Sequence, residues 1–267
     1  MKIREIKSKT ILTDSRLPEV NYCINPYVGC AHACTYCYAR FMRRFTGHNN
    51  EKWGEFIDVK TNAAEIIEKQ LFTKSKKGAI LLGSVTDAYQ PIEKKYQLTR
   101  SILEKIIKNS FPISILTKSS LVTRDIDLLQ KINTCEVGIT ITMLNSKYSS
   151  IIEPRASSPQ DRIKAIDELK KAGIKTYVFI GPILPGITDL DEIFRQIQNK
   201  VDFVMAESLN QKFGDWDGLI KAITNCSSVL LELYQAGFDK KYWDETEKKI
   251  VLLSKKYNIK LKGFYRH

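Results

Sequence analysis

The chain has 267 residues, of which 43% are hydrophobic and 10% aromatic, so it can bury a large core as one α/β barrel or as two small domains. Its first residues mix charges of both signs, and its longest weakly polar stretch is interrupted by Gly181, Pro182, Pro185 and Gly186, which argues against a signal peptide and against a spanning helix of roughly 20 residues. We therefore expect a cytoplasmic protein that binds no membrane. The 42 Lys and Arg residues and 30 Asp and Glu residues give a net charge of +12, which favours polyanionic partners, although a general lysine bias explains it equally well.

Short apolar runs alternate with amphipathic helical stretches along most of the chain. The expected strands span residues 20–26, 79–83, 113–117, 136–142, 175–181 and 202–206. The expected helices span residues 62–73, 97–109, 124–131, 159–172, 189–199 and 215–235. This alternation predicts an α/β fold with a parallel sheet. Six such units are too few for a closed eight-stranded barrel, so we expect a partial (β/α)6 barrel of the TIM type, with ligands at the carboxyl ends of its strands.

Two further segments complete the predicted organisation. Residues 46–60, with several Gly and Asn residues, are expected to form an irregular insertion. Residues 242–267 are expected to form a charged helix and a final strand at 260–264 that covers one side of the sheet. The sequence has no low-complexity linker and no internal repeat, which favours a single domain over residues 1–267, with a core at about 18–210 and a carboxyl-terminal extension at about 211–267.

Three of the six cysteines, Cys30, Cys34 and Cys37, lie close together in the segment CAHACTYC. This count is too sparse for a disulfide scaffold, and the clustering indicates reduced metal ligands. No fourth cysteine follows at ferredoxin spacing, so the three thiolates would hold three irons of a cubane and leave the fourth iron open for chemistry. The alternatives are a structural zinc site completed by His32 or His48, and buried cysteines without a metal.

The CxxxCxxC spacing, with Tyr36 before the last cysteine, resembles the signature of the radical S-adenosylmethionine (SAM) superfamily. Five segments resemble its spore photoproduct lyase-like branch: NPYVGCAHACTYCYAR, GSVTDAYQPIEKKYQLTR, ILTKSSLVTRDIDLL, IIEPRASSPQDRIKAIDELKKAGI and GPILPGITD. The resemblance implies a 4Fe–4S cluster on the three cysteines and SAM chelating the open iron. It also implies reductive cleavage to a 5'-deoxyadenosyl radical that abstracts hydrogen from a substrate, with electrons from an external donor of the flavodoxin or ferredoxin type.

Polar side chains at the predicted strand ends are candidates for binding the cofactor. Ser84, Thr86 and Asp87 end the second strand, where members of the superfamily receive the ammonium group of SAM, although a capped turn is the alternative. Lys118 follows the next strand and is placed to pair with the cofactor carboxylate, whereas a solvated lysine is the ordinary expectation.

Later strands supply further candidates. Thr140 and Thr142 point to one face of their strand, where the family binds ribose. Glu153 and Arg162 either form a salt bridge that orders a loop, or Arg162 grips the methionyl carboxylate in bidentate fashion.

Two tyrosines beside the cysteines are the candidates for catalysis. Tyr36 and Tyr38 match tyrosines of the lyase that relay a hydrogen atom, although packing against the cluster is the alternative. The lyase also uses a further cysteine near the end of its second strand, and here no cysteine lies between Ala39 and Thr134. Repair of thymine dimers by the lyase reaction is therefore not expected.

Three functions remain open at this point. The first is a radical enzyme acting on DNA or RNA, which the net charge and the group Arg40, Arg43 and Arg44 favour. The second is a radical enzyme acting on a small metabolite or a protein side chain. The third is a non-catalytic iron–sulfur protein that carries electrons or senses oxygen.

Overall fold

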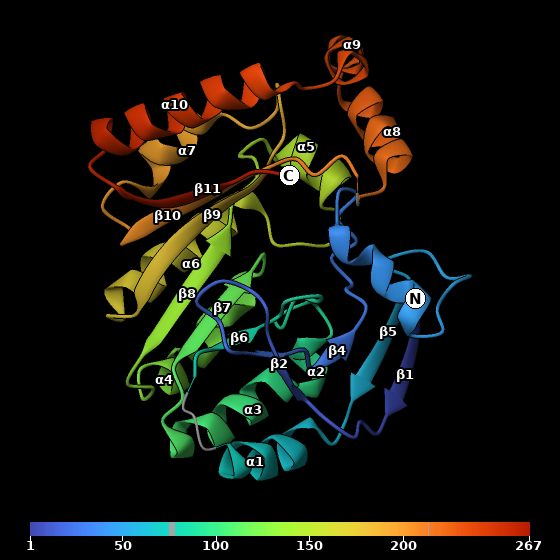
Figure 1. Cartoon of the computed structure of the whole chain (residues 1–267), viewed down its shortest axis with the longest axis vertical. Coiled ribbons are helices and arrows are strands. Elements are labelled where there is room, and N and C mark those ends of the chain that lie inside the picture. Colours follow the sequence, from blue (N-terminus) through green and yellow to red (C-terminus); the bar gives the residue numbers. More distant parts are fainter. Residues whose placement is uncertain (75–77, 213) are drawn as a thin grey trace.

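The computed structural model describes residues 1–74, 78–212 and 214–267. Its main feature is an open sheet of eight strands in the order β11-β10-β9-β8-β7-β6-β3-β2 (Figure 1). From β3 to β11 all neighbouring strands pair in parallel, and β2 pairs antiparallel with β3. The strands are β2 (Leu12–Asp14), β3 (Tyr22–Ile24), β6 (Ile80–Leu82), β7 (Ile113–Thr117), β8 (Cys135–Thr140), β9 (Lys175–Ile183), β10 (Phe203–Ser208) and β11 (Lys260–Tyr265).

Parallel strands that follow one another in chain order are typical of a partial βα barrel. The strands β3, β6, β7, β8, β9 and β10 of this sheet correspond to the six predicted strands, so the predicted fold class is confirmed. The last strand of the carboxyl-terminal extension, β11, continues the sheet beyond β10. All carboxyl ends of these parallel strands lie at one edge, which is where the fold places ligands.

The helices begin and end where the capping chemistry of the sequence requires. In α6, Ser158 Oγ accepts a hydrogen bond from the Asp161 amide at 3.1 Å, Pro159 is the first residue, and Gly173 follows the last turn with a φ of +76°. Within the described residues, no helix has the length and apolar character needed to cross a membrane. The α-helices are α1 (Ala63–Thr73), α2 (Glu93–Tyr96), α3 (Leu98–Ile106), α4 (Ile126–Leu129), α5 (Ser146–Ile152), α6 (Pro159–Lys171), α7 (Leu190–Ile197), α8 (Trp216–Cys226), α9 (Ser228–Ala236) and α10 (Lys240–Lys256), and the 3-10 helices are η1 (Tyr38–Phe45), η2 (Ile107–Asn109) and η3 (Ser120–Asp125).

A second, three-stranded sheet corrects the prediction for residues 46–60. These residues are not irregular throughout, because β5 (Phe56–Lys60) lies between β1 (Lys2–Ile6) and β4 (Tyr27–Val28). The strand β5 pairs in parallel with β1 and antiparallel with β4, which leads directly into the cysteine segment. Figure 1 shows this small sheet beside the amino-terminal end of the chain, apart from the main sheet.

Two predicted helices also differ from the structure. Residues 215–235 form α8 and α9 because the backbone of Ser227, with φ −167° and ψ 129°, is extended and interrupts the helix. Residues 124–131 are only partly α-helical, since η3 covers their beginning and α4 is a single turn. In both places the apolar periodicity continues across the break, so the pattern carries no signal for it.

A substitution of Phe56 can test whether residues 46–60 pack into the core of the protein. Its side chain is fully buried, and Phe56→Ala is expected to lower the free energy of unfolding by about 3–5 kcal/mol because it leaves a cavity. Phe72→Ala is the matched control, since Phe72 is 86% exposed and should change stability by less than about 0.5 kcal/mol. Urea unfolding of the two variants measures the difference, and equal losses would contradict the packing.

Candidate active site

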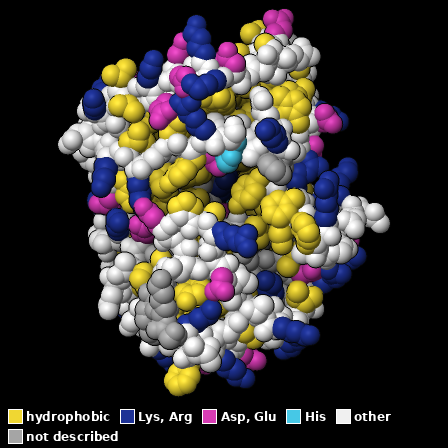
Figure 2. Space-filling view, in the orientation of Figure 1, with side chains coloured by type: hydrophobic (Ala, Val, Ile, Leu, Met, Phe, Trp, Pro, Cys, Tyr) yellow, Lys and Arg dark blue, Asp and Glu magenta, His cyan; other side chains and the backbone are white. Residues whose placement is uncertain are grey.

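A cavity of about 800 Å³ opens at the carboxyl ends of the parallel strands. The three cysteines of the predicted metal site all line it, together with residues that follow β6, β7 and β10 and residues near the carboxyl ends of β8 and β9. Figure 2 shows a hollow near the middle of this face, with hydrophobic side chains gathered around it and Lys and Arg side chains nearby. The candidate site residues from the sequence that line the cavity are Cys30, His32, Cys34, Tyr36, Cys37, Tyr38, Arg44, Ser84, Thr86, Asp87, Lys118 and Thr140.

The cysteine loop is fixed by the segment that follows β6. Gln90 is fully buried, and its amide oxygen accepts from the Ala31 N–H at 2.7 Å while its amide nitrogen donates to the Gly29 carbonyl at 3.2 Å. Gly29 has a φ of +83°, and a Cβ there would lie 2.4 Å from the Phe56 carbonyl oxygen, so only glycine fits. These contacts hold the thiols on one wall of the cavity.

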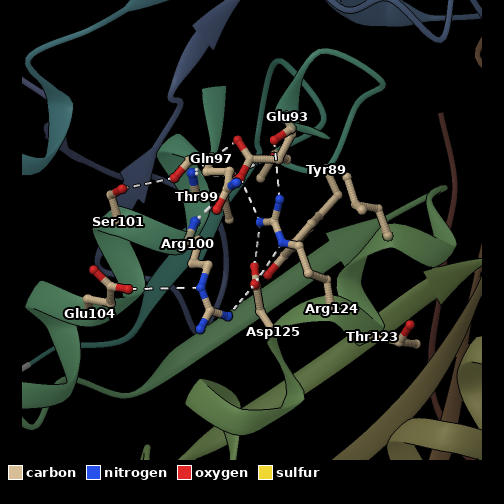
Figure 3. Close-up of polar contacts among 12 residues, drawn as sticks. Tyr89, Glu93, Gln97, Thr99, Arg100, Ser101, Glu104, Thr123, Arg124 and Asp125 are labelled. Atoms are coloured by element: carbon tan, nitrogen blue, oxygen red, sulfur yellow. Dashed lines mark hydrogen bonds and ion pairs between the residues drawn. The ribbon is translucent and has the colours of Figure 1, made fainter. Parts of the chain in front are cut away.

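A buried ion network supports the same segment from behind (Figure 3). The Glu93 carboxylate is fully buried and accepts from the Tyr27 hydroxyl and from the Arg124 guanidinium, the latter at 2.8 Å. Arg124 also contacts Asp125 at 2.7 Å, and Asp125 in turn accepts from Arg100 at 2.9 Å. Buried carboxylates with arginine partners are strongly held, because separating them would leave an unpaired charge inside the protein. The network therefore ties β4 and α2 to α3 and η3.

The electrostatics of the three thiols suit metal binding. Burial raises the pKa of all three, that of Cys34 to about 12. Lys118 opposes the rise at Cys34 and at Cys37, and the Trp53 N–H opposes it at Cys37. Iron replaces the thiol proton on binding, so buried thiols with a cation beside them fit a cluster better than they fit a free nucleophile. The three cysteines and the adjoining cavity therefore have the donor set and the space that a cluster needs.

Both histidines proposed as zinc ligands are engaged with carboxylates instead. His32 Nδ1 lies 3.3 Å from Asp87 Oδ2, and His48 Nε2 lies 3.0 Å from Asp58 Oδ2. Across residues 1–74, 78–212 and 214–267, no three His, Cys, Asp or Glu side chains converge on a single metal ion. A cubane makes no such demand, because each cysteine binds a different iron.

Asp87 joins the ends of β6 and β7. Its carboxylate accepts hydrogen bonds from the Thr117 hydroxyl at 2.7 Å, from the Lys118 amide at 2.8 Å and from the Tyr89 amide at 2.8 Å. Burial opposes ionisation of Asp87, but His32 and these hydrogen bonds outweigh it and lower its pKa to about 2. The carboxylate therefore holds the turn as an ionised acceptor, which is the alternative that the sequence offered.

Ser84 and Thr86 also have partners within the protein. Ser84 Oγ accepts from Asn25 Nδ2 at 3.0 Å, and Thr86 Oγ1 donates to the Gly29 carbonyl. Tyr38 donates its hydroxyl hydrogen to the Ser84 carbonyl and is 48% exposed at the cavity mouth. The end of β6 is thus bonded on both sides to the cysteine loop and to η1.

Lys118 presents its ammonium group to the cavity. Its Nζ lies 5.5 Å from the centroid of the Tyr36 ring. No carboxylate of the described residues lies within 4.0 Å of this ammonium group, although Cys34 and Glu153 raise its pKa against the effect of burial. Lys118 is therefore a charged group available to an anion in the cavity.

Arg162 forms the salt bridge with Glu153 that the sequence gave as one of its two roles. The side chain is fully buried, and it also donates to the carbonyls of Thr140 at 3.1 Å and Ser157 at 2.9 Å. Glu153 accepts in addition from the Tyr36 hydroxyl. Arg162 thus acts behind the cavity wall, where it holds Glu153, and through Glu153 the tyrosine between Cys34 and Cys37.

The two threonines of the fourth predicted strand occupy different places. Thr140 ends β8 and lines the cavity. Thr142 lies beyond the strand, donates to the Gly181 carbonyl at 3.0 Å and sits 3.3 Å from the Tyr36 hydroxyl. The hydroxyl of Thr142 therefore helps to place Tyr36 and the end of β9.

Several residues at the cavity escaped the sequence analysis. Most are aromatic or apolar, and His267 is polar, with its Nε2 lying 2.6 Å from Glu207 Oε1. Part of this set has a signal in the sequence, because aromatic residues recur in η1 at Tyr38, Phe41 and Phe45. The residues missed include Leu17, Phe41, Phe45, Trp53, Phe179 and His267.

Comparison with known proteins identifies the family of the chain. A sequence model of the radical SAM superfamily matches residues 24–197. An uncharacterized protein of Methanocaldococcus jannaschii is 38% identical over 275 residues, which cover 100% of this chain and 98% of that protein. A radical SAM Nα-GlyT isomerase of Pseudomonas phage M6 is 30% identical over 169 residues, which cover 63% of this chain and 34% of the isomerase.

Among solved structures, a spore photoproduct lyase mutant has a TM-score of 0.69 at 19% identity and matches 99% of this chain and 81% of its own. The lyase complexed with a dinucleoside spore photoproduct has a TM-score of 0.67 at 18% identity and also covers 99% of this chain, with 81% of its own. The chain belongs to the radical SAM superfamily. Its cofactors are accordingly the 4Fe–4S cluster and SAM that this family uses, and it is a radical SAM enzyme.

The depressed pKa of Asp87 predicts how stability depends on pH. Because its folded pKa of about 2 lies below that of an unfolded aspartate, the stabilisation is fully present above about pH 4 and is lost as the pH falls toward 2. Asp87→Asn removes this contribution, so the stability difference from the wild type should shrink by about 2 kcal/mol between pH 5 and pH 2. Urea unfolding of the apoprotein across this range tests it, and a difference that stays constant with pH would contradict the assignment.

Proposed function

We propose that Cys30, Cys34 and Cys37 hold the 4Fe–4S cluster, and that the enzyme abstracts hydrogen from a nucleotide of a DNA or RNA strand. When bound, the cluster supplies the electron that cleaves SAM to a 5'-deoxyadenosyl radical, as in the family. One observation carries the proposal: a single cavity has the three thiols on its wall and aromatic and cationic side chains at its mouth.

The cavity residues divide the binding of SAM among them. Lys118 is the best placed cation for the methionyl carboxylate, because it lines the cavity beside Cys34 and Cys37 and has no carboxylate partner within 4.0 Å among the described residues. Ser84, which follows β6, is our candidate for binding the ammonium, and Thr140, at the end of β8, is our candidate for the ribose, because both line the cavity.

The other four candidates act through neighbours. Thr86 and Asp87 fix the loops that carry Gly29 and Lys118, since their side chains bond to these backbones. Arg162 and Thr142 fix Tyr36 and the end of β9 in the same way. We therefore assign these four as positioning residues for the cofactor site. Tyr36 and Tyr38 remain our candidates for relaying a hydrogen atom.

The mouth of the cavity favours a nucleic-acid strand. Three rings on η1 form a short ladder, with centroids 6.4 Å apart for Tyr38 and Phe41 and 6.1 Å apart for Phe41 and Phe45. Phe45 is 76% exposed, and Arg44 beside it is exposed and lines the mouth. Bases stack on exposed aromatic rings and phosphates bind arginine, so this surface combines both kinds of contact in a chain of net charge +12.

The similarity to spore photoproduct lyase supports the same class of substrate, because that enzyme has been solved with a dinucleoside spore photoproduct. The reaction differs in our proposal, since Gly83 and Ser84 stand at the end of β6 and no cysteine of the described residues other than the three ligands lines the cavity. We expect an electron donor of the flavodoxin or ferredoxin type to reduce the enzyme.

Cofactor cleavage is the first test of this proposal. After anaerobic reconstitution with iron and sulfide, dithionite and SAM should yield 5'-deoxyadenosine and methionine. Cys30→Ala, Cys34→Ala and Cys37→Ala should each abolish both products, because each removes one iron ligand. Cys135→Ala is the matched control, since Cys135 begins β8 away from the cavity, and should retain the wild-type rate. Full activity in any of the three ligand variants would refute the cluster assignment.

Nucleic-acid binding is the second test. The wild type should bind single-stranded DNA or RNA with an affinity that falls as salt rises. Arg44→Gln should weaken this binding and make the slope of log K against log salt less steep by about 0.7, the loss of one phosphate contact. Arg195→Gln is the control, because Arg195 is exposed on α7 and paired with Glu192. Binding that salt does not change, or equal effects of the two variants, would favour a small metabolite or a protein side chain as substrate.

A further inference from the structure

The indole N–H of Trp53 is a buried donor that the fold itself does not use. Trp53 lines the cavity in which Cys37 also lies. Its Nε1 is shielded from solvent and has no hydrogen-bond partner of ordinary geometry among the described residues. Buried indole N–H groups almost always have an acceptor, so an unused one beside a predicted metal site calls for a ligand.

The ring of Trp53 is held in place by aromatic packing. It meets Phe56 edge to face, with centroids 5.9 Å apart and planes at 77°. The Phe56 ring also stacks on the His48 ring, with centroids 3.8 Å apart and an angle of 14° between the ring planes. His48 is fully buried and is bonded to Asp58 at 3.0 Å, and Arg4 donates to the same carboxylate. The indole is thus anchored to β5 and cannot turn freely toward solvent.

The backbone next to Trp53 packs directly against the cysteine loop. Gly54 has a φ of +89°, and a Cβ there would lie only 2.3 Å from the Cβ of Ala33, between two of the cysteines. Arg155 donates to the Gly54 carbonyl at 2.8 Å and so holds this contact closed. Cys37 lines the same cavity as Trp53, and its sulfur is the acceptor with which the indole N–H interacts, without the geometry of a full hydrogen bond.

We propose that the Trp53 N–H donates a hydrogen bond to the sulfur of Cys37 in the cluster-bound enzyme and raises the reduction potential of the cluster. The inference rests on the proposed function, since it needs a cluster on Cys37. Reduction adds a negative charge to the cluster, and a donor to a ligand sulfur stabilises that charge. The hydrogen bond makes the cluster easier to reduce. In this role Trp53 acts through the Cys37 sulfur and does not contact the substrate.

Trp53→Phe tests the inference because it removes the N–H and keeps an aromatic ring against Phe56. The measurement is an anaerobic redox titration of the reconstituted enzyme, followed by the electron paramagnetic resonance signal of the reduced cluster. The midpoint potential should shift to a more negative value in Trp53→Phe. Trp216→Phe is the matched control, since Trp216 lies on α8 in contact with Tyr234 and should keep the wild-type potential.

The outcomes separate this inference from the proposed function. An unchanged midpoint in Trp53→Phe with wild-type iron content would overturn the hydrogen bond and leave SAM cleavage by the wild type untouched. A wild type that assembles no cluster would overturn both.

A second measurement on the wild type does not depend on whether the variant folds. Tryptophan labelled with ¹⁵N in the indole should give a ¹⁵N hyperfine coupling in pulsed resonance spectra of the reduced cluster. The coupling should persist in labelled Trp216→Phe. Its absence from the labelled wild type would rule the contact out.

Discussion

The hydrogen bonds of the Gln90 amide to the backbone of the cysteine loop are the contacts on which the site depends. They join Ala31 and Gly29 to the segment after β6, and so fix the thiols relative to the edge of the sheet where SAM would bind. Glu93 and Arg124 hold that segment from the opposite side. A neutral amide fully inside the protein needs both its donor and its acceptor satisfied, so this join has little freedom to shift.

A second support reaches the loop from the later strands. The Arg162 guanidinium neutralises Glu153, and Glu153 receives the hydroxyl of Tyr36. The charge of the pair stays behind the wall, while Lys118 faces the cavity. The ion pair of Arg162 and Glu153, which stabilises the fold, is therefore separate from Lys118, which is available to a ligand. The cysteine loop is supported from the β6 side and from the β8 side of the sheet.

The sequence predicts every strand of the main sheet except β2, mostly because short apolar runs alternate with helical stretches, as at residues 113–117. It does not predict β5, since the partner of Phe56 is Lys2, far away in the chain, and β5 has no repeated pattern of its own. The same holds for the site. Cys30, Cys34 and Cys37 are recognisable because their spacing is local, whereas Trp53 reaches the cavity only through the long-range packing of Phe56 and Gly54. The sequence also does not predict the direction in which a side chain points. It predicts both Asp87 and Lys118 at strand ends, and only the structure shows that the Asp87 carboxylate is bonded to backbone amides.

One cavity is shared by the cysteine loop and by the aromatic mouth, and this sharing has a thermodynamic consequence. Phe41 and Cys37 line this cavity, so a ligand that filled it would exclude water from the surroundings of both residues. A lower local dielectric changes the relative energies of the oxidised and reduced cluster, so occupancy and redox state are linked. Linkage is reciprocal, and the redox state that an occupant favours must bind that occupant more tightly by the same factor.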